Sequence, residues 1–253
     1  MGGLEGKVVL VTGGGAGIGR HSCLAFAARG ARVVATDYNG SAAEAVAHDI
    51  RSSGGEAIGL RTDVTIEADV AASVAAGLER FGGIDCAFNN AGILGPVGIP
   101  LSELAEADWA RTIAVNLTGV MLCMKHELNV MLPRGRGAIV NMSSATGLVA
   151  APLNPAYGAA KHGVIGLTRS AAAAHARDGV RINAICPGTV QTDMITSLGA
   201  AHKAASGTFA TPAPIGRLAD PDEIAACVVW LCSDDASYVT GHALAADGGW
   251  TAT

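Results

Sequence analysis

The chain has 253 residues, half of them apolar and 15% charged, with a net charge of −5. This length can bury a sizeable core, and an acidic chain without a basic run is not expected to bind nucleic acid. No apolar run is long enough to cross a membrane, and the six cysteines contain no C-x-x-C pair. We therefore expect a cytoplasmic protein with free thiols.

Short apolar runs alternate with helical patterns along the chain. Strands are predicted at Lys7–Thr12, Ala31–Asp37, Ala57–Thr62, Ile84–Asn89, Gly137–Met142, Val180–Cys186 and Ala243–Ala245. Helices are predicted at Gly17–Gly30, Ser41–Ser53, Ala68–Phe81, Leu101–Met131, Tyr157–Arg177 and Asp220–Leu231. Runs such as 8–11 (VVLV) are apolar on both faces, as in parallel strands covered on both sides. The pattern predicts an α/β fold: a single-domain, Rossmann-type, doubly wound parallel sheet with helices on both faces, spanning residues 1–253.

One long segment, Asp193–Gly216, resists this alternation and is rich in Ala, Gly, Ser and Pro. Connections of this length in a compact domain often serve as lids or binding loops. We therefore predict a substrate lid at residues 193–216.

A glycine-rich turn, Thr12–Gly19, lies between the first predicted strand and the first predicted helix. Glycines let the backbone approach a pyrophosphate, and the helix N-terminus offers it N–H groups. Asp37, at the end of the second strand, is placed to accept hydrogen bonds from the adenosine ribose. Since no Arg or Lys lies at 13–18 or 36–40 to receive a 2′-phosphate, NAD is favoured over NADP.

Tyr157 and Lys161 lie one helical turn apart, with Ser144 thirteen residues before the tyrosine. A free tyrosine, with a pKa near ~10, is a poor proton donor or acceptor at neutral pH. A nearby positive charge favours the phenolate, so we expect Lys161 to lower the pKa of Tyr157. Ser144 could hold a carbonyl or alcohol oxygen.

These motifs together resemble the short-chain dehydrogenase/reductase family over essentially the whole chain. The resemblance rests on the glycine turn, Asn89–Gly92, the serine, tyrosine and lysine, the segment Pro187–Thr192 and the tail Tyr238–Gly249. It implies four catalytic residues, Asn116, Ser144, Tyr157 and Lys161. It also implies cofactor contacts from Gly13, Gly17, Ile18, Gly19, Asp37, Asp63, Val64, Asn89, Ala91, Gly92, Tyr157, Lys161, Pro187, Gly188, Val190 and Thr192. Ser143 adjoins Ser144, but the family spacing and strand alternation favour Ser144.

The resulting functional prediction is an NAD(H)-dependent oxidoreductase that interconverts a neutral, partly apolar ketone and its secondary alcohol, with Tyr157 as general acid and base. Substrate contacts are expected from Ser144, Leu94, Val149, Leu153, Met194 and Leu198. Scattered histidines without a Cys/His cluster imply no metal. Two alternatives remain: a 3-oxoacyl-(acyl-carrier-protein) reductase and a non-catalytic nucleotide-sensing scaffold. The family resemblance also implies a homotetramer.

Overall fold

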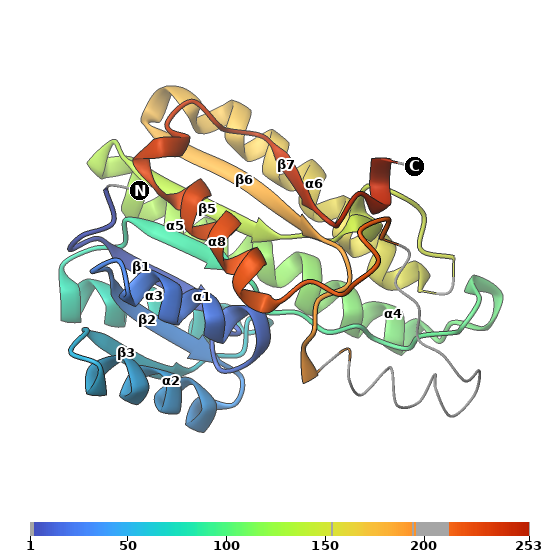
Figure 1. Ribbon diagram of the computed structural model, residues 1–253, viewed down its shortest axis with the longest axis horizontal. Helices are drawn as coiled ribbons and strands as arrows, with labels where there is room; N and C mark the ends of the chain where they lie inside the picture. Colours follow the sequence, from blue (N-terminus) through green and yellow to red (C-terminus); the bar gives the residue numbers. More distant parts are fainter. Residues whose placement is uncertain (1–2, 153, 194, 196–212, 253) are drawn as a thin grey trace.

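Seven parallel strands form one sheet at the centre of the protein (Figure 1). The computed structural model describes residues 3–152, 154–193, 195 and 213–252. The sheet order is β3-β2-β1-β4-β5-β6-β7. The strands are β1 (Val8–Thr12), β2 (Arg32–Asp37), β3 (Ala57–Arg61), β4 (Cys86–Asn89), β5 (Gly137–Met142), β6 (Val180–Pro187) and β7 (Ala243–Ala246). The predicted doubly wound Rossmann-type fold is confirmed, and all seven predicted strands are present to within one or two residues at either end.

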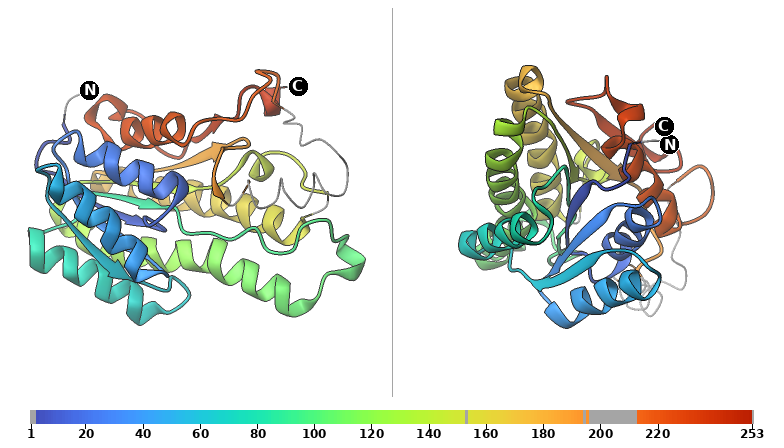
Figure 2. Two further views of the ribbon diagram at one scale, coloured as in Figure 1. Left: turned by 60° about the horizontal axis from the view of Figure 1, so that its bottom comes forward. Right: turned by 90° about the vertical axis from the view of Figure 1, so that its left-hand side faces the viewer.

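Helices cover both faces of the sheet, as the two views in Figure 2 show. One face carries α1 (Gly17–Ala27), α2 (Gly40–Ser52) and α8 (Pro221–Cys232). The other face carries α3 (Glu67–Phe81), α5 (Gly119–Met131) and α6 (Pro155–His175). In β1, Val9 and Val11 pack into the first layer while Val8 and Leu10 pack into the second. The run is apolar throughout because both faces of the strand are buried.

The long helix predicted at Leu101–Met131 is wrong in its first turns. Residues Leu101–Glu103 form a separate 3₁₀ turn, and α4 (Glu106–Ile113) begins only after the extended residue Ala105. Two acidic residues in the first turn of α4 favour a helix N-terminus there. A π-helical turn, Ala114–Thr118, then joins α4 to α5.

The helix predicted from Tyr157 begins two residues earlier, at Pro155. Asn154 caps it, because its side-chain oxygen accepts a hydrogen bond from the backbone N–H of Tyr157 at 3.4 Å. Proline at the first helical position suits this start, since its missing N–H would have no partner in the helix. Most of the predicted lid, 193–216, lies outside the described residues. Within the part of the chain that the structure describes, no helix is long and apolar enough to cross a membrane.

Candidate active site

A cavity of about 510 Å³ lies at the carboxyl edge of the sheet, where β1, β4, β5 and β6 end. This is the edge at which doubly wound folds bind their ligands. The cavity brings together most of the residues predicted from the sequence: Gly13, Gly17, Ile18, Asp37, Ala91, Gly92, Leu94, Asn116, Ser144, Tyr157, Lys161, Pro187, Gly188, Val190 and Thr192.

A second cavity of about 590 Å³ lies at the opposite edge, around the amino ends of the strands. The arginines around it serve the fold: Arg134 binds Asp85 at 2.8 Å, and Arg181 binds the carbonyl of Leu231 at 2.8 Å. This second cavity lies away from the glycine turn and the tyrosine. The cavity at the carboxyl edge is therefore the candidate active site.

The glycine turn is shaped for close approach of a ligand. Gly13 and Gly17 have φ angles of +63° and +48°, which side chains rarely adopt. A Cβ on Gly13 would lie 2.8 Å from Nδ2 of Asn90. At the start of α1, Ala16 provides no side-chain cap, so the first-turn N–H groups are left for an anion. The turn therefore fits a pyrophosphate.

Asp37 lies at the end of β2 and lines the cavity. Its carboxylate accepts hydrogen bonds from the backbone N–H groups of Gly15, at 3.0 Å, and Asn39, at 2.9 Å. Arg61 is its register partner on β3. The search for basic residues at 36–40 could not reveal this neighbour, because it lies on another strand. The Arg61 guanidinium lies over the Tyr38 ring, 5.3 Å from the centroid. The carboxylate is thus held in place beside the glycine turn.

Asn116 is fully buried within the π-helical turn. Its Oδ1 accepts a hydrogen bond from the backbone N–H of Ile93 at 3.0 Å. Its Nδ2 donates to the carbonyls of Ile93 and Thr112, at 2.8 and 3.1 Å. The widened turn carries the asparagine to the segment after β4, and π-turns are frequent at functional sites.

The two serines after β5 differ in environment, as expected from strand alternation. Ser143 is buried and its hydroxyl donates to the backbone carbonyl of Lys161 at 2.9 Å. Ser144 is half-buried, lines the cavity and accepts hydrogen bonds from the N–H and the hydroxyl of Thr146, at 3.2 and 3.0 Å. Ser143 also lines the cavity, but only Ser144 is partly exposed, so we expect Ser144 to be the serine that contacts a ligand.

Tyr157 and Lys161 share one face of α6, with the lysine Nζ 5.4 Å from the centroid of the tyrosine ring. The ammonium donates to the carbonyl of Met142 at 2.8 Å. Burial raises the pKa of Tyr157 to about 12, while its hydrogen bond with Ser144 acts in the opposite direction. Burial lowers the pKa of Lys161 to about 8, and the nearby Cys186 opposes this. The expected lowering of the tyrosine pKa is thus not what the structure shows, because desolvation dominates.

Some predicted residues do not line the cavity. Asp63 instead accepts hydrogen bonds from Thr65, and Asn89 is 1% exposed within a polar network described below. Gly19, Val64 and Val149 are likewise absent from the lining. Leu153, Met194 and Leu198 lie outside the described residues.

Five lining residues were missed by the sequence reasoning: Met142, Thr146, Ala151, Asn154 and Trp250. Asn154 could have been found, since Asn followed by Pro is a typical helix start. Its Nδ2 also donates to the carbonyl of Leu94 at 2.9 Å, so the helix cap is joined to the segment after β4. Trp250 follows the last strand, and only the fold brings it to the cavity.

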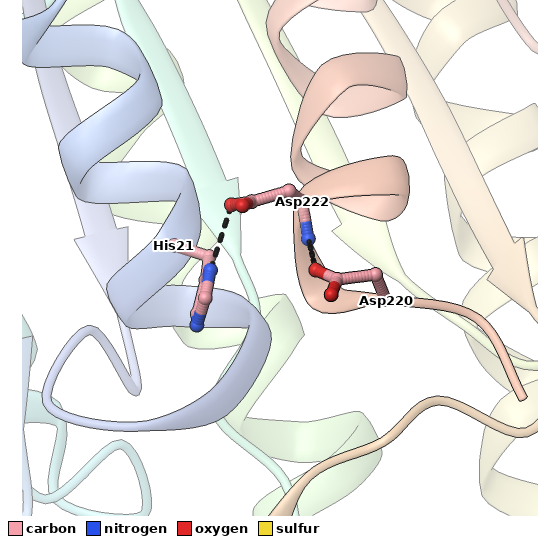
Figure 3. A group of neighbouring side chains, drawn as sticks. All are labelled: His21, Asp220 and Asp222. Atoms are coloured by element: carbon pink, nitrogen blue, oxygen red, sulfur yellow. Dashed lines mark hydrogen bonds and ion pairs between the residues drawn. The ribbon is translucent and has the colours of Figure 1, made fainter.

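One group of potential metal ligands occurs among the described residues: His21, Asp220 and Asp222 (Figure 3). Asp220 caps α8 by accepting a hydrogen bond from the N–H of Asp222 at 2.9 Å. Asp222 in turn pairs with Nδ1 of His21 at 2.7 Å, at the surface. Helix capping and an exposed ion pair account for these contacts.

Comparison with known proteins agrees with this geometry. A family model described as enoyl-(acyl carrier protein) reductase matches residues 13–251. The chain is 46% identical, over all of both chains, to 2,5-dichloro-2,5-cyclohexadiene-1,4-diol dehydrogenase from Sphingobium indicum. It is also 46% identical to cis-4-hydroxycyclohexanecarboxylate dehydrogenase from Sinomonas cyclohexanicum, over 97% of each chain. The crystal structure of levodione reductase superposes with a TM-score of 0.93, at 38% identity, over 98% of this chain and 99% of that one.

The fold and the cavity thus define an oxidoreductase that acts on CH–OH groups with a nicotinamide dinucleotide. The chain belongs to the short-chain dehydrogenase/reductase family, as its motifs predicted.

Proposed function

We propose that this protein is an NAD(H)-dependent oxidoreductase that interconverts a neutral six-membered-ring ketone and its secondary alcohol. The observation that carries the proposal is the convergence of Ser144, Tyr157 and Lys161 on a cavity that also holds the glycine turn. The four catalytic residues predicted from the family resemblance are all present, which favours turnover over a nucleotide-sensing scaffold.

The cofactor would be held along the carboxyl edge of the sheet. The glycine turn would receive the pyrophosphate, and Asp37 the adenosine ribose hydroxyls. Pro187, Gly188 and Thr192 line the part of the cavity that β6 contributes and would contact the carboxamide. When bound, the nicotinamide supplies or accepts the hydride.

The protein's own residues manage the proton and the developing charge. Tyr157 would donate its phenolic proton to the carbonyl oxygen in reduction and accept it back in oxidation. Ser144 would hold that oxygen as negative charge develops on it. The Lys161 ammonium, buried one helical turn from the tyrosine, would hold ribose hydroxyls. Asn116, which fixes the segment after β4, would anchor a water on the path from Lys161 to solvent.

The choice of a ring substrate follows from two relatives and from the cavity. The Sphingobium relative is named for a cyclohexadiene diol and the Sinomonas relative for a hydroxycyclohexane acid. In this chain Ile93, Leu94, Val97 and Trp250 provide apolar walls, which suit an uncharged carbon ring. No arginine is among the described lining residues, and Lys161 is their only lysine, so we infer that the substrate lacks a carboxylate.

A substrate series separates this proposal from its alternatives. NADH oxidation is followed with cyclohexanone derivatives, with a 3-oxoacyl thioester and with no added carbonyl compound. The proposal predicts turnover of the ring ketones with a kcat/KM well above that of the thioester. A preference for the thioester would favour the acyl-carrier reductase, and no turnover of any carbonyl compound would favour the scaffold.

A further inference from the structure

A network of buried polar side chains lies behind the catalytic edge of the sheet. Its members are Glu127 on α5, Asn89 at the end of β4, Asn141 on β5 and Thr168 on α6. Each is at most 1% exposed. A fully buried carboxyl group is rare, and it is costly unless it has hydrogen-bond partners.

Hydrogen bonds join these side chains in series. Nδ2 of Asn89 donates to Oε2 of Glu127 and to Oδ1 of Asn141, both at 3.0 Å. Nδ2 of Asn141 donates to Oγ1 of Thr168 at 2.9 Å. Asn89 and Asn141 are register partners in the β4–β5 pair. One carboxyl group is therefore linked to two central strands and, through them, to a second helix.

In both β4 and β5, the residue that follows the network member makes a contact at the active site. Asn90, which follows Asn89, donates its Nδ2 to the carbonyl of Gly13 in the glycine turn at 3.0 Å. Met142 follows Asn141, and its carbonyl accepts a hydrogen bond from the Lys161 ammonium at 2.8 Å. The network thus lies directly behind the contacts that fix the glycine turn and the lysine.

The Glu127 carboxyl group is suited to its neutral form. Burial raises the pKa of Glu127 to about 8, although the hydrogen bond from Asn89 acts in the opposite direction. Its second oxygen, Oε1, has no hydrogen-bond partner among the described residues. An ionised carboxylate would leave that charged oxygen buried and unpaired, which is strongly unfavourable.

Other titratable groups near Glu127 do not provide an ionic partner. Cys123, one turn earlier on α5, is buried, and burial together with Glu127 raises its pKa well above the ordinary value. Lys125 and His126 pair with Glu67 of α3 at the surface. From β4, β5 and α6 the network presents only amide and hydroxyl groups.

We propose that Glu127 is a positioning residue whose protonated side chain holds the ends of β4 and β5 in the geometry that the glycine turn and Lys161 require. Ionisation of this one group at alkaline pH would place an unpaired charge at Oε1 behind both contacts, and we expect that charge to disturb the two contacts together. The effect reaches the cofactor through Asn90 and Met142, since Glu127 itself does not line the cavity.

The role of the proton on Glu127 is tested by comparing wild type with Glu127→Gln, which carries a neutral side chain of the same shape. The folded-state pKa lies above the unfolded value, so Glu127 contributes most stability below the unfolded pKa and loses it as pH rises through about 8. We expect the melting temperature of Glu127→Gln to rise relative to wild type between about pH 5 and about pH 9. Parallel melting curves over this range would overturn the proposal. The measurement needs neither cofactor nor substrate, so it is independent of the proposed function.

The positioning role is tested by the affinity for NADH, measured by fluorescence across the same pH range. Wild type should lose affinity above about pH 8, where Glu127 ionises, more steeply than Glu127→Gln. The change in charge of Lys161 is common to both proteins and cancels in this comparison. Glu127→Leu, which removes the acceptor for Asn89, should bind NADH at least about tenfold more weakly at neutral pH. Glu79→Gln, an exposed change on α3, is the control and should match wild type. If wild type and Glu127→Gln lose NADH affinity in parallel, the positioning role is wrong.

Discussion

At the residue scale, Tyr157 is the group on which proton transfer depends. Tyr157→Phe removes only the phenolic hydroxyl, so we expect kcat to fall by about 10²–10⁴. NADH should still bind, because the glycine turn and Asp37 are unchanged. Steady-state kinetics check the fall in kcat, and an NADH fluorescence titration checks that the cofactor still binds. A variant that keeps a tenth of the wild-type kcat would show that another group transfers the proton.

The carboxylate of Asp37 should set the choice of cofactor. A 2′-phosphate placed ~4 Å from it costs about 4 kcal/mol per charge pair at an effective dielectric of ~20, before screening by solvent. We expect kcat/KM for NADH to exceed that for NADPH by at least about a hundredfold. Asp37→Asn should narrow this ratio, since it removes the charge and keeps the shape. Equal kcat/KM values for the two cofactors in the wild type would contradict the assignment. Arg61 pairs with Asp37 in the β2–β3 register. Equal values would then mean that Arg61 binds the 2′-phosphate.

Residue contacts between distant segments were the least predictable part of the site. The glycine turn, Ser144, Tyr157 and Lys161 could be predicted because their spacing along the chain is itself the signal. Glu127 gave no signal, since glutamate on a helix usually faces solvent. Only the register of β4 against β5 brings Asn89 and Asn141 together behind it.

At the element scale, the strands were predicted well because strands buried on both faces are apolar throughout. Helix ends were predicted less well. The extended residue Ala105, which separates α4 from the turn before it, has no glycine or proline to mark it. The π-helical turn at Ala114–Thr118 leaves no mark in the hydrophobic pattern either, yet it carries Asn116.

The capping box of α8 offers a test of local helix stability. Asp220→Ala removes the side-chain acceptor at the N-cap, which typically costs about 1 kcal/mol. The expected drop in melting temperature is about 2–4 °C. Asp222→Asn, which removes a first-turn charge and the exposed pair with His21 but leaves the cap, should cost less. Calorimetry checks both variants, and the cap would be shown to be unimportant if Asp220→Ala melted no lower than Asp222→Asn.

At the scale of the whole molecule, we predict a homotetramer. Trp109 on α4 and Met121 on α5 are large apolar side chains with 38% and 39% of their surface exposed. Gly166 on α6 has open space where a side chain would begin. Helices with small exposed residues can approach closely, so α4, α5 and α6 could pair across a two-fold axis. Tyr238, fully exposed near the last strand, would belong to a second interface.

Light scattering tests this assembly with a variant that the single subunit tolerates. A Cβ at Gly166 would meet nothing within 4 Å beyond its own helix backbone, so we expect the single subunit to tolerate Gly166→Arg and any loss of assembly to come from the interface. Ala45→Arg, on the exposed face of α2, is the matched control and should remain tetrameric. A wild-type protein with the mass of a monomer at micromolar concentration would refute the prediction.

The most direct test of the proposed function compares two ring alcohols that differ by one carboxylate group. One is cyclohexanol, and the other is cis-4-hydroxycyclohexanecarboxylate, the compound for which the Sinomonas relative is named. Both carry the same ring and secondary alcohol, and NAD⁺ reduction reports their oxidation. Because the described cavity offers no arginine to a carboxylate, we predict a higher kcat/KM for cyclohexanol. A higher kcat/KM for the carboxylate would contradict the account of the substrate pocket.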